Sequence, residues 1–334
     1  MQSMVQKKKI AIIGTGISGL AAATGLEKTC DITFFEKARG VGGRIATRYA
    51  GVFEFDHGAQ YFTVKNPVFH RFIEPLYREG IVRRWDARFV EIEKRTVTLS
   101  RQWNQHIPHY VADYRMNTLP KHIAKNFNVY LEKKITNLHR INNQWQLQTD
   151  QDKLSEHFDW VILAIPSHQA IELLPKTMPF TNQLSNVVMK GCYVLMLGFE
   201  NNMAFPWDAA LVKQSCISWI SVNSSKPNRP EKQTLVVLSS NQWADDHNQD
   251  EYQSVKHQLW SEATNIIGLP LSQATHHDLH QWRYANYKKN TLETSWIDEE
   301  QQVGLCGDWT QQGRVEAAFL SGVNLANQIL LNIK

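Results

Sequence analysis

Three glycines between a short apolar run and a run of small residues constrain the fold of this chain more than any other feature. Gly14, Gly16 and Gly19 follow the apolar run IAII at the spacing GxGxxG, and residues 20–26 then have the pattern of a helix. In such a strand–turn–helix unit the first glycine permits the tight turn, and the second lets a pyrophosphate approach the backbone. The third lets the helix pack on the strand. The spacing therefore predicts a Rossmann-type dinucleotide site.

The same stretch also has the outline of a secretory signal, because Lys7 to Lys9 precede it. A second apolar run, DITFF at 31–35, and the acidic Glu36 that follows it favour the dinucleotide site. Glu36 lies 22 residues after Gly14, where an acidic side chain binds a ribose hydroxyl in dinucleotide-binding units. A cleaved signal has no use for such a residue. We therefore expect an adenosine with free ribose hydroxyls as part of the ligand.

Composition limits the classes that remain. The chain has 334 residues, 43% hydrophobic and 20% charged, which suits a two-domain globular protein, and its net charge of +4 is dispersed, so nucleic acid is not indicated. Four widely spaced cysteines form no CxxC pair, and we expect them to be reduced and mostly buried. After residue 27 no apolar run approaches the roughly 20 residues that span a bilayer. These features predict a cytoplasmic protein that does not enter a membrane.

A second glycine-rich segment follows Glu36 directly. Gly40, Gly42 and Gly43 surround Arg39 and Arg44 in a loop too rich in glycine to be a helix. Arginine beside free backbone amides suits a pyrophosphate. Taken alone, the segment also fits a flexible surface loop.

The last part of the sequence suggests which dinucleotide is bound. The run VGLCGDWT at 303–310 has the pattern of a strand ending in Gly307 and Asp308, and a helix rich in small residues follows. FAD extends beyond its ADP half and so needs such an additional strand and helix, whereas an ordinary NAD domain does not. Asp308 could accept a ribitol or ribose hydroxyl, or simply cap the helix, whose positive end could face N1 and C2=O of the flavin. We therefore expect non-covalently bound FAD.

These segments together resemble the flavin-dependent amine oxidase superfamily. The resemblance is carried by GTGISGL (14–20), Glu36, GVGGR (40–44), DHGAQYF (56–62) and the terminal GD with its helix. Within the superfamily the chain is similar to the renalase family and its bacterial members. Segments that match the substrate domain of that family are RRWDARFVE (83–91), PWDAALV (206–212), ISWISVNSSKPNR (217–229) and QWRYANY (281–287). The resemblance covers essentially the whole chain.

The resemblance implies an α/β fold with a Rossmann-type FAD-binding domain and a second, mainly antiparallel β-sheet substrate domain, as in amine oxidases and p-hydroxybenzoate hydroxylase. Residues 193–199, 216–222 and 234–239 have the pattern of neighbouring antiparallel strands. The segment 223–233 (NSSKPNRPEKQ) has the composition of a linker. The expected domains are an FAD-binding domain of 1–77, 113–167 and 300–334, and a substrate domain of 78–112 and 168–299.

The resemblance also implies which residues hold FAD; Ile135, for example, lies in the strand that matches the adenine side of the family's site. The expected FAD-binding residues are Gly14, Gly16, Ser18, Gly19, Glu36, Lys37, Arg39, Gly43, Arg44, Ala59, Gln60, Tyr61, Ile135, Gly307, Asp308, Val315, Glu316 and Ala317.

The renalase resemblance implies that 1,2- or 1,6-dihydro isomers of NAD(P)H are reoxidised to NAD(P)+ by hydride transfer to flavin N5, with O2 reduced to hydrogen peroxide. The ring nitrogen of a dihydronicotinamide drives hydride departure, so no general base and no catalytic side chain are expected. Aromatic side chains would hold the substrate, and two amides would orient its carboxamide, unless these residues serve packing or turns. The substrate-binding candidates are Gln60, Tyr61, Trp207, Trp219, Asn223, Trp282 and Tyr284.

Two other classes of function stay open at the level of sequence: an amine oxidase or desaturase on the same scaffold, and a flavin-binding protein without catalysis. Histidines 276, 277 and 280 do not indicate a metal, because strand alternation places His277 opposite the other two and no carboxylate or cysteine completes a ligand set. We expect these histidines to be solvated. The sequence decides neither the oligomeric state nor the preference between NAD and NADP.

Overall fold

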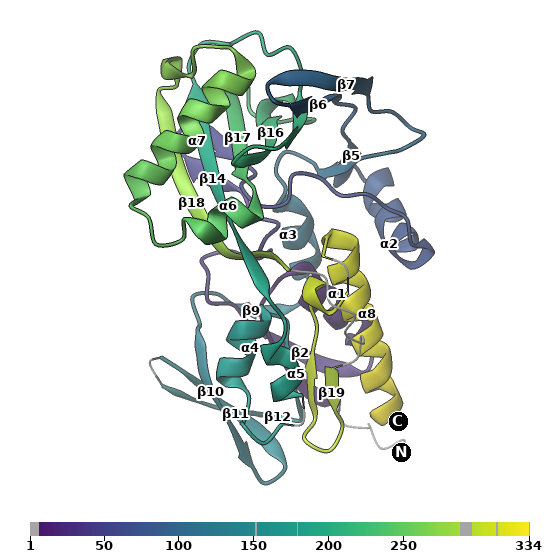
Figure 1. The fold of residues 1–334 in the computed structure, drawn as a ribbon. Coiled ribbons are helices and arrows are strands. Elements are labelled where there is room, and N and C mark those ends of the chain that lie inside the picture. Colours follow the sequence, from purple (N-terminus) through teal and green to yellow (C-terminus); the bar gives the residue numbers. More distant parts are fainter. Residues whose placement is uncertain (1–6, 151, 179, 288–295, 312, 334) are drawn as a thin grey trace. The chain divides into compact units, whose positions relative to one another are not determined.

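The computed structural model describes residues 7–150, 152–178, 180–287, 296–311 and 313–333 (Figure 1). The chain divides into two compact units, of which the first is drawn from 1–43, 120–189 and 287–334 and the second from 44–119 and 190–286. The expected α/β fold, with a Rossmann-type part and a mainly antiparallel sheet, is confirmed. Residues 44–77 group with the second unit and 168–189 with the first. The functional domain boundaries given above stay a prediction, because contacts alone define these units.

A six-stranded sheet in the order β19-β20-β13-β1-β2-β9 forms the centre of the first unit. Only β19 is antiparallel to its neighbour; the other pairs are parallel. Strand β13 is buried throughout, as expected for a parallel sheet packed on both faces. The first unit contains β1 (Lys8–Ile13), α1 (Ile17–Leu26), β2 (Cys30–Phe35), α3 (Thr118–Ala124), β9 (Asn128–Tyr130), β10 (Ile135–Ile141), β11 (Gln144–Thr149), β12 (Lys153–Phe158), β13 (Trp160–Leu163), α4 (Ser167–Leu173), α5 (Thr181–Ser185), β19 (Trp296–Asp298), β20 (Val303–Leu305), the 3-10 turn η3 (Asp308–Thr310) and α8 (Val315–Asn332).

The last strand and helix pack against the first Rossmann element. Strand β20 pairs with β13, which lies beside β1, and Figure 1 shows α8 alongside α1. A side chain at Gly322 would overlap the carbonyl oxygen of Ser18, and a Cβ at Gly25 would lie 2.8 Å from that of Ala326. The small residues of the terminal helix therefore allow the two helices to lie close together. The stretch that resembles a signal builds the core of this unit.

A seven-stranded sheet in the order β18-β14-β17-β16-β15-β6-β7 forms the second unit, with the expected antiparallel arrangement of β14, β17 and β16. Strand β15 pairs in parallel with β6. The second unit contains β3 (Arg48–Ala50), β4 (Phe53–Phe55), α2 (Pro67–Arg78), β5 (Val82–Arg84), β6 (Arg88–Glu93), β7 (Thr96–Gln102), β8 (Tyr110–Ala112), β14 (Met189–Phe199), β15 (Ala209–Lys213), β16 (Ile217–Val222), η1 (Asn223–Ser225), β17 (Gln233–Ser239), α6 (Asn241–Asp246), α7 (Tyr252–Ile267), η2 (Leu271–Gln273) and β18 (His276–Tyr287).

Strand β14 separates two apolar clusters of this unit. Its residues Leu195 and Leu197 pack in the cluster that contains the buried face of α7, whereas Val194 and Met196 pack in the cluster that contains Phe53. Because successive side chains of a strand point to opposite faces, one strand supplies both clusters. The hairpin of β3 and β4 is thereby fixed to the sheet.

All four cysteines are free of disulfides, and three of them are buried, as predicted; Cys216 is half-buried. Within the described ranges no helix has both the length and the apolar character needed to cross a membrane.

Candidate functional site

The turn after β1 has the geometry that the glycine spacing predicts. Gly14 has a φ of +97°, which side chains rarely allow, and its amide donates to the carbonyl of Phe35 at 2.9 Å. A Cβ at Gly14 would lie 2.7 Å from the carbonyl oxygen of Ala164, and one at Gly19 would lie 2.6 Å from that of Gly14. Both glycines are therefore required by the chain's own backbone and packing.

Gly16 has no such internal reason to be glycine. Its φ of −67° suits any residue, and the nearest atom to an added Cβ is 4.0 Å away. Helix α1 begins at the next residue, and no side chain of Gly16 caps its first amides. Gly43 lies alongside, with its Cβ position 3.5 Å from the Cα of Gly16. The space at Gly16 lies in front of the first amides of α1, which no side chain caps. It can hold the pyrophosphate of a dinucleotide such as FAD.

Glu36 lies at the end of β2 and is only 7% exposed. Its Oε2 accepts hydrogen bonds from the amide of Thr15 at 3.0 Å and from its hydroxyl at 2.7 Å, and its Oε1 accepts one from the amide of Ala38 at 2.9 Å. Each carboxylate oxygen can accept two hydrogen bonds, so Oε1 keeps capacity for one more donor. The carboxylate is thus held in place by the chain and still suits a ribose hydroxyl.

The other expected cofactor residues near this turn differ in exposure. Lys37 and Arg39 are exposed, and the ammonium of Lys37 donates to the side chain of Gln169 at 3.0 Å. Ile135 is buried at the start of β10. Ser18 is buried in α1, and its side chain is engaged with Cys306.

Gly307 and Asp308 connect β20 to the turn η3. The hydroxyl of Ser321 in α8 accepts hydrogen bonds from the amide of Gly307 at 3.1 Å and from the hydroxyl of Thr310 at 2.8 Å. Asp308 is 6% exposed. Because α8 begins only at Val315, Asp308 is not the cap of that helix, which removes one of its two predicted roles.

The start of α8 is strained. Arg314 has a φ of +123°, which non-glycine residues rarely adopt, and its side chain does not cap the helix. The first residues of the helix include the expected cofactor residues Val315, Glu316 and Ala317, of which Val315 and Ala317 are buried. The positive end of this helix lies in the same unit as the glycine turn.

In the second unit, the segment 56–61 packs directly on the backbone of Arg44. The amide of Ala59 donates to the carbonyl of Arg44 at 2.9 Å, and a side chain at Gly58 would overlap that carbonyl. The guanidinium of Arg44 donates to the carbonyl of Ala285 at 3.2 Å. The position of the Arg44 backbone therefore depends on the segment 56–61.

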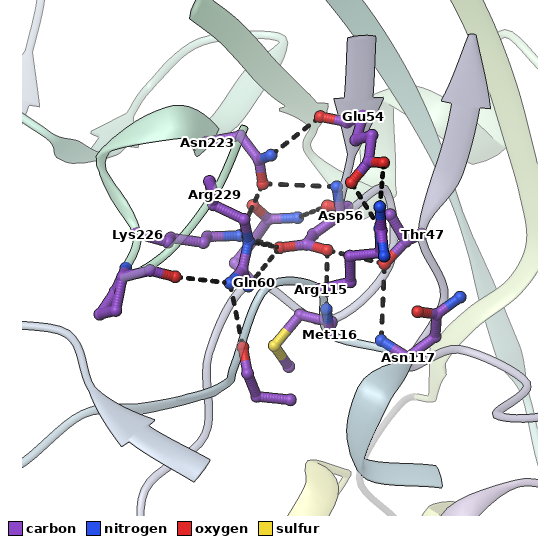
Figure 2. Close-up of polar contacts among 12 residues, drawn as sticks. Thr47, Glu54, Asp56, Gln60, Arg115, Met116, Asn117, Asn223, Lys226 and Arg229 are labelled. Atoms are coloured by element: carbon purple, nitrogen blue, oxygen red, sulfur yellow. Dashed lines mark hydrogen bonds and ion pairs between the residues drawn. The ribbon is translucent and has the colours of Figure 1, made fainter. Parts of the chain in front are cut away.

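A buried cluster of charged and amide side chains surrounds Asp56 (Figure 2). One carboxylate oxygen accepts from the hydroxyl of Thr47 at 2.8 Å and the amide of Met116 at 2.9 Å. The other accepts from Lys226 at 3.2 Å and from Nε and Nη2 of Arg229 at 3.0 and 2.8 Å. The side chains of Asp56 and Lys226 are 0% exposed and that of Arg229 is 1% exposed.

The charges of this cluster change the protonation behaviour of its members. Burial by itself would raise the pKa of Asp56, but the charges of Lys226 and Arg229 outweigh burial and hold that pKa far below its ordinary value. Burial lowers the pKa of Lys226 to about 8, although the charge of Asp56 opposes this shift. The carboxylate of Asp56 thus contacts two cations, Lys226 and Arg229, at a place that solvent does not reach.

Two predicted carboxamide ligands belong to this cluster instead. Nε2 of Gln60 donates to the carbonyls of Asp56 and Gly58, and its Oε1 accepts from Ser221 and Lys226. The amide of Asn223 is equally engaged, with the backbone of Glu54 and Asp56, Thr234 and Lys226 as partners. With both ends of each amide engaged, neither suits a substrate carboxamide, and the prediction for these residues does not agree with the structure.

Two of the predicted aromatic residues do come together. The rings of Tyr61 and Trp219 have centroids 5.4 Å apart. Trp103 and His109, which the sequence did not single out, complete the group, because they stack on each other at 3.6 Å and both contact Tyr61. Burial lowers the pKa of His109, so this imidazole is neutral near pH 7. We call these four residues the Tyr61 aromatic group.

The other aromatic candidates lie elsewhere in the second unit. Trp207 is 3% exposed and packs inside the apolar cluster beside α7, a position that favours a packing role over the predicted contact with substrate. Trp282 stacks on His57 with centroids 5.2 Å apart and donates to the carbonyl of that residue at 2.8 Å. Tyr284 is half-buried on β18.

The expectation of solvated histidines holds only for His277, which is exposed. His276 packs against the rings of Phe53 and Phe55, and His280 contacts His57 at 4.9 Å between centroids. Among the described residues no group of three histidines, cysteines or carboxylates is placed to bind a metal.

The sequence analysis missed the importance of Asp56, Lys226 and Arg229. The segment 223–233 was expected to be a linker, yet Lys226 is buried in it because Asp56 lies within hydrogen-bonding distance. The available signal was indirect: a lysine and an arginine three residues apart in a turn, and an aspartate directly after an apolar strand.

A glycine turn open to a pyrophosphate, an acidic residue at the end of β2, and a terminal strand and helix joined to that turn define a dinucleotide-binding flavoprotein. The model of an NAD(P)-binding Rossmann-like domain matches residues 12–76, and that of the flavin containing amine oxidoreductases matches residues 86–330. The second match spans most of the chain, so the chain belongs to the flavin containing amine oxidoreductase family. It is a flavin-dependent oxidoreductase, and its cofactor is FAD.

Solved structures agree on the fold along almost the full length of the chain. A protein from Exiguobacterium sp. 255-15 assigned as a protoporphyrinogen oxidase has 13% identity and a TM-score of 0.76, over 98% of this chain and 100% of that one. Cyclohexylamine oxidase from Brevibacterium oxydans IH-35A has 13% identity and a TM-score of 0.73 over the same shares. Putrescine oxidase bound to putrescine has 12% identity and a TM-score of 0.68 over 98% and 99%. At these identities the likeness shows the fold alone.

Proposed function

We propose that this oxidoreductase is an oxidase of isomeric dihydronicotinamides, which converts 1,2- or 1,6-dihydro-NAD(P) to NAD(P)+. When bound, the flavin would supply a two-electron acceptor that takes a hydride equivalent at N5 and passes the electrons to O2, giving hydrogen peroxide. The proposal draws on the resemblance of the substrate segments to the renalase family.

The observation that carries the choice of substrate is the chemistry of the Tyr61 aromatic group. Tyr61 and Trp219 are half-buried, the buried Trp103 and His109 stack on each other beside them, and none of the four carries a carboxylate. A flat, uncharged dihydropyridine ring suits such surroundings. The lone pair of its ring nitrogen drives hydride departure, so the neutral His109 does not have to remove a proton.

FAD would be held by residues whose chemistry matches its parts. Glu36 would bind an adenosine ribose hydroxyl, and the first amides of α1 together with Arg39 and Arg44 would bind the pyrophosphate. Asp308 would accept a ribitol hydroxyl. Burial raises the pKa of the Cys306 thiol to about 12, which leaves no thiolate for a covalent link to the flavin and supports non-covalent binding.

The test is anaerobic mixing of the purified yellow protein with each dihydro isomer, with ordinary NADH, and with simple amines, followed by admission of oxygen. We expect rapid bleaching of the flavin by the isomers alone, and one peroxide for each substrate oxidised after oxygen is added. Bleaching by amines alone would replace the proposal by an amine oxidase, and bleaching by none of the three would favour a flavin-binding protein with another role. Recovery of colour without peroxide would mean that another acceptor takes the electrons.

A further inference from the structure

The ammonium of Lys226 is the most enclosed cation of the Asp56 cluster (Figure 2). It has three acceptors, Oδ2 of Asp56 at 3.2 Å, Oδ1 of Asn223 at 3.0 Å and Oε1 of Gln60 at 3.4 Å. An ammonium carries three hydrogens and no lone pair, so these three contacts use its whole capacity. It also lies 5.5 Å from the centre of the Trp85 ring.

Asp56 does not need this second cation for neutrality. Arg229 alone would balance one carboxylate, and Lys226 leaves Asp56, Lys226 and Arg229 with a net charge of +1 away from water. A buried excess charge costs free energy, so its presence here calls for an explanation. The role that the contacts indicate is the orientation of an amide.

Lys226 is one of the partners that fix which way the side chain of Gln60 points. The amide oxygen of Gln60 accepts from Lys226 and from the hydroxyl of Ser221 at 2.7 Å, and Nε2 points to the carbonyls of Asp56 at 2.6 Å and Gly58 at 2.9 Å. These bonds hold the backbone of 56–58, and the next residue, Ala59, donates to the carbonyl of Arg44. A path of hydrogen bonds and backbone thus leads from Lys226 to Arg44 and Tyr61.

We propose that Lys226 is a positioning residue of the FAD site, whose ammonium orients Gln60 and so holds the segment 56–61 against the backbone of Arg44. The inference rests on the proposed function, in which Arg44 binds the pyrophosphate of FAD and Tyr61 belongs to the aromatic group that holds the substrate. Lys226 acts through this segment and touches no reacting atom.

Loss of the proton from Lys226 would weaken this arrangement. A neutral amine has two hydrogens for three acceptors and turns a lone pair toward one of them, so Gln60 can lose one of the contacts that fix its orientation. The charged groups around Lys226 are Asp56 and Arg229 in direct contact, the Glu54–Arg115 ion pair beside Asn223, and Asp113, bonded to Asn228. The arginines keep their charge at all relevant pH values, and the pKa of Asp56 is low, so Lys226 is the member that titrates near pH 8.

The first test is the affinity of the apoprotein for FAD between pH 6.5 and 9.5. If only protonated Lys226 supports tight binding, the wild-type dissociation constant should rise about ten-fold between pH 7 and 9. Lys226→Met should bind about ten-fold more weakly at pH 7 and change little above it. Lys226→Arg should bind within about three-fold of wild type at pH 7 without the alkaline loss, because a guanidinium stays charged. Lys232→Met, at an exposed lysine paired with Glu200, should behave as wild type.

A second measurement uses no cofactor: the protection of amides 56–61 against hydrogen exchange, corrected for intrinsic rates. We expect protection to fall from pH 7 to 9 in wild type and in Lys232→Met, and to stay constant in Lys226→Arg. Wild-type protein that binds no FAD at pH 7 would contradict the proposed function, and exchange would still test the role of Lys226. Affinity and protection that are flat from pH 7 to 9, or an equal alkaline loss in Lys226→Arg, would overturn the inference. Both measurements still test the inference if Lys226→Met fails to fold, because each also compares wild type with Lys226→Arg.

Discussion

Asp56 accepts two hydrogen bonds from the guanidinium of Arg229 through a single carboxylate oxygen, at 3.0 and 2.8 Å, and neither side chain reaches solvent. Replacing Arg229 by methionine leaves Lys226 as the remaining cation in contact with this carboxylate, and removes both hydrogen bonds from Arg229 as well as those to the carbonyls of Ala112 and Pro227. We expect a loss of about 3 to 5 kcal/mol in the free energy of unfolding, measured by urea titration with FAD absent. The control is Lys232→Met, which breaks an exposed ion pair and should cost at most about 1 kcal/mol. Equal effects of the two variants would mean that burial of the pair does not matter.

Acid should destabilise the second unit through His57. Burial, followed by the charges of His280 and Arg48, lowers the pKa of His57 to about 3. The unfolded chain therefore binds a proton that the folded protein does not, so stability is complete above about pH 6.5 and decreases as the pH falls toward 3. The decrease is about 1.4 kcal/mol per pH unit for this histidine. Urea titrations at pH 7 and pH 5 should show a smaller difference for His57→Phe than for wild type, and the exposed His106→Gln should leave the difference unchanged.

Gly16 and Gly19 should respond differently to substitution. Gly16→Val points a side chain into open space, so the protein should fold and yet bind FAD at least ten-fold more weakly, because the valine occupies the approach to the helix amides. Gly19→Ala meets the carbonyl of Gly14 and should lower the melting temperature of the apoprotein by several degrees. FAD titration and thermal unfolding of both variants separate the two effects. Tight FAD binding by Gly16→Val would place the pyrophosphate elsewhere.

Asp308 should contribute to flavin retention without capping α8. We expect Asp308→Ala to lose FAD on dialysis, with a dissociation constant raised about ten-fold, which corresponds to one charge-assisted hydrogen bond. Asp308→Asn, which keeps an acceptor oxygen, should retain part of the affinity. The bound flavin is measured by absorbance after dialysis, and unchanged content in Asp308→Ala would remove this residue from the site.

Trp219 and Trp207 are the same residue type with opposite expected roles. Trp219→Leu alters the Tyr61 aromatic group and should raise KM for a dihydronicotinamide several-fold with little change in FAD content. Trp207→Leu leaves a cavity in the apolar cluster and should cost about 3 kcal/mol of stability instead. Steady-state kinetics beside urea titration distinguishes the two. A raised KM for Trp207→Leu without loss of stability would indicate that Trp207 contacts the substrate.

The elements that sequence predicts well here are those whose cause is local. The spacing of Gly14, Gly16 and Gly19 predicts the turn, and the continuous apolar run at 193–199 predicts a buried strand. A terminal strand and helix were predicted in the FAD-binding part because FAD requires them, and the structure shows that this strand, β20, pairs with β13.

The features that the sequence does not reveal depend on partners far apart along the chain. Lys226 becomes a buried residue only because Asp56, 170 positions earlier, supplies its counter-charge. Gln60 and Asn223 have the chemistry of carboxamide ligands, and only the fold shows that their own neighbours already use it. Trp207 and Trp219 differ in surroundings that no local pattern encodes.

The place of β20 in its sheet also bears on how the molecule is made. Strands β1, β2 and β13 leave the ribosome long before residues 303–305, so during synthesis the edge of β13 where β20 later pairs has no partner strand, and α1 has no α8 to cover Gly25. A nascent chain of this protein therefore carries an open sheet edge from the synthesis of β13 until β20 has been made. We expect chaperones that bind exposed strands to engage it in that interval, and the cofactor to enter only after β20 and α8 have been made.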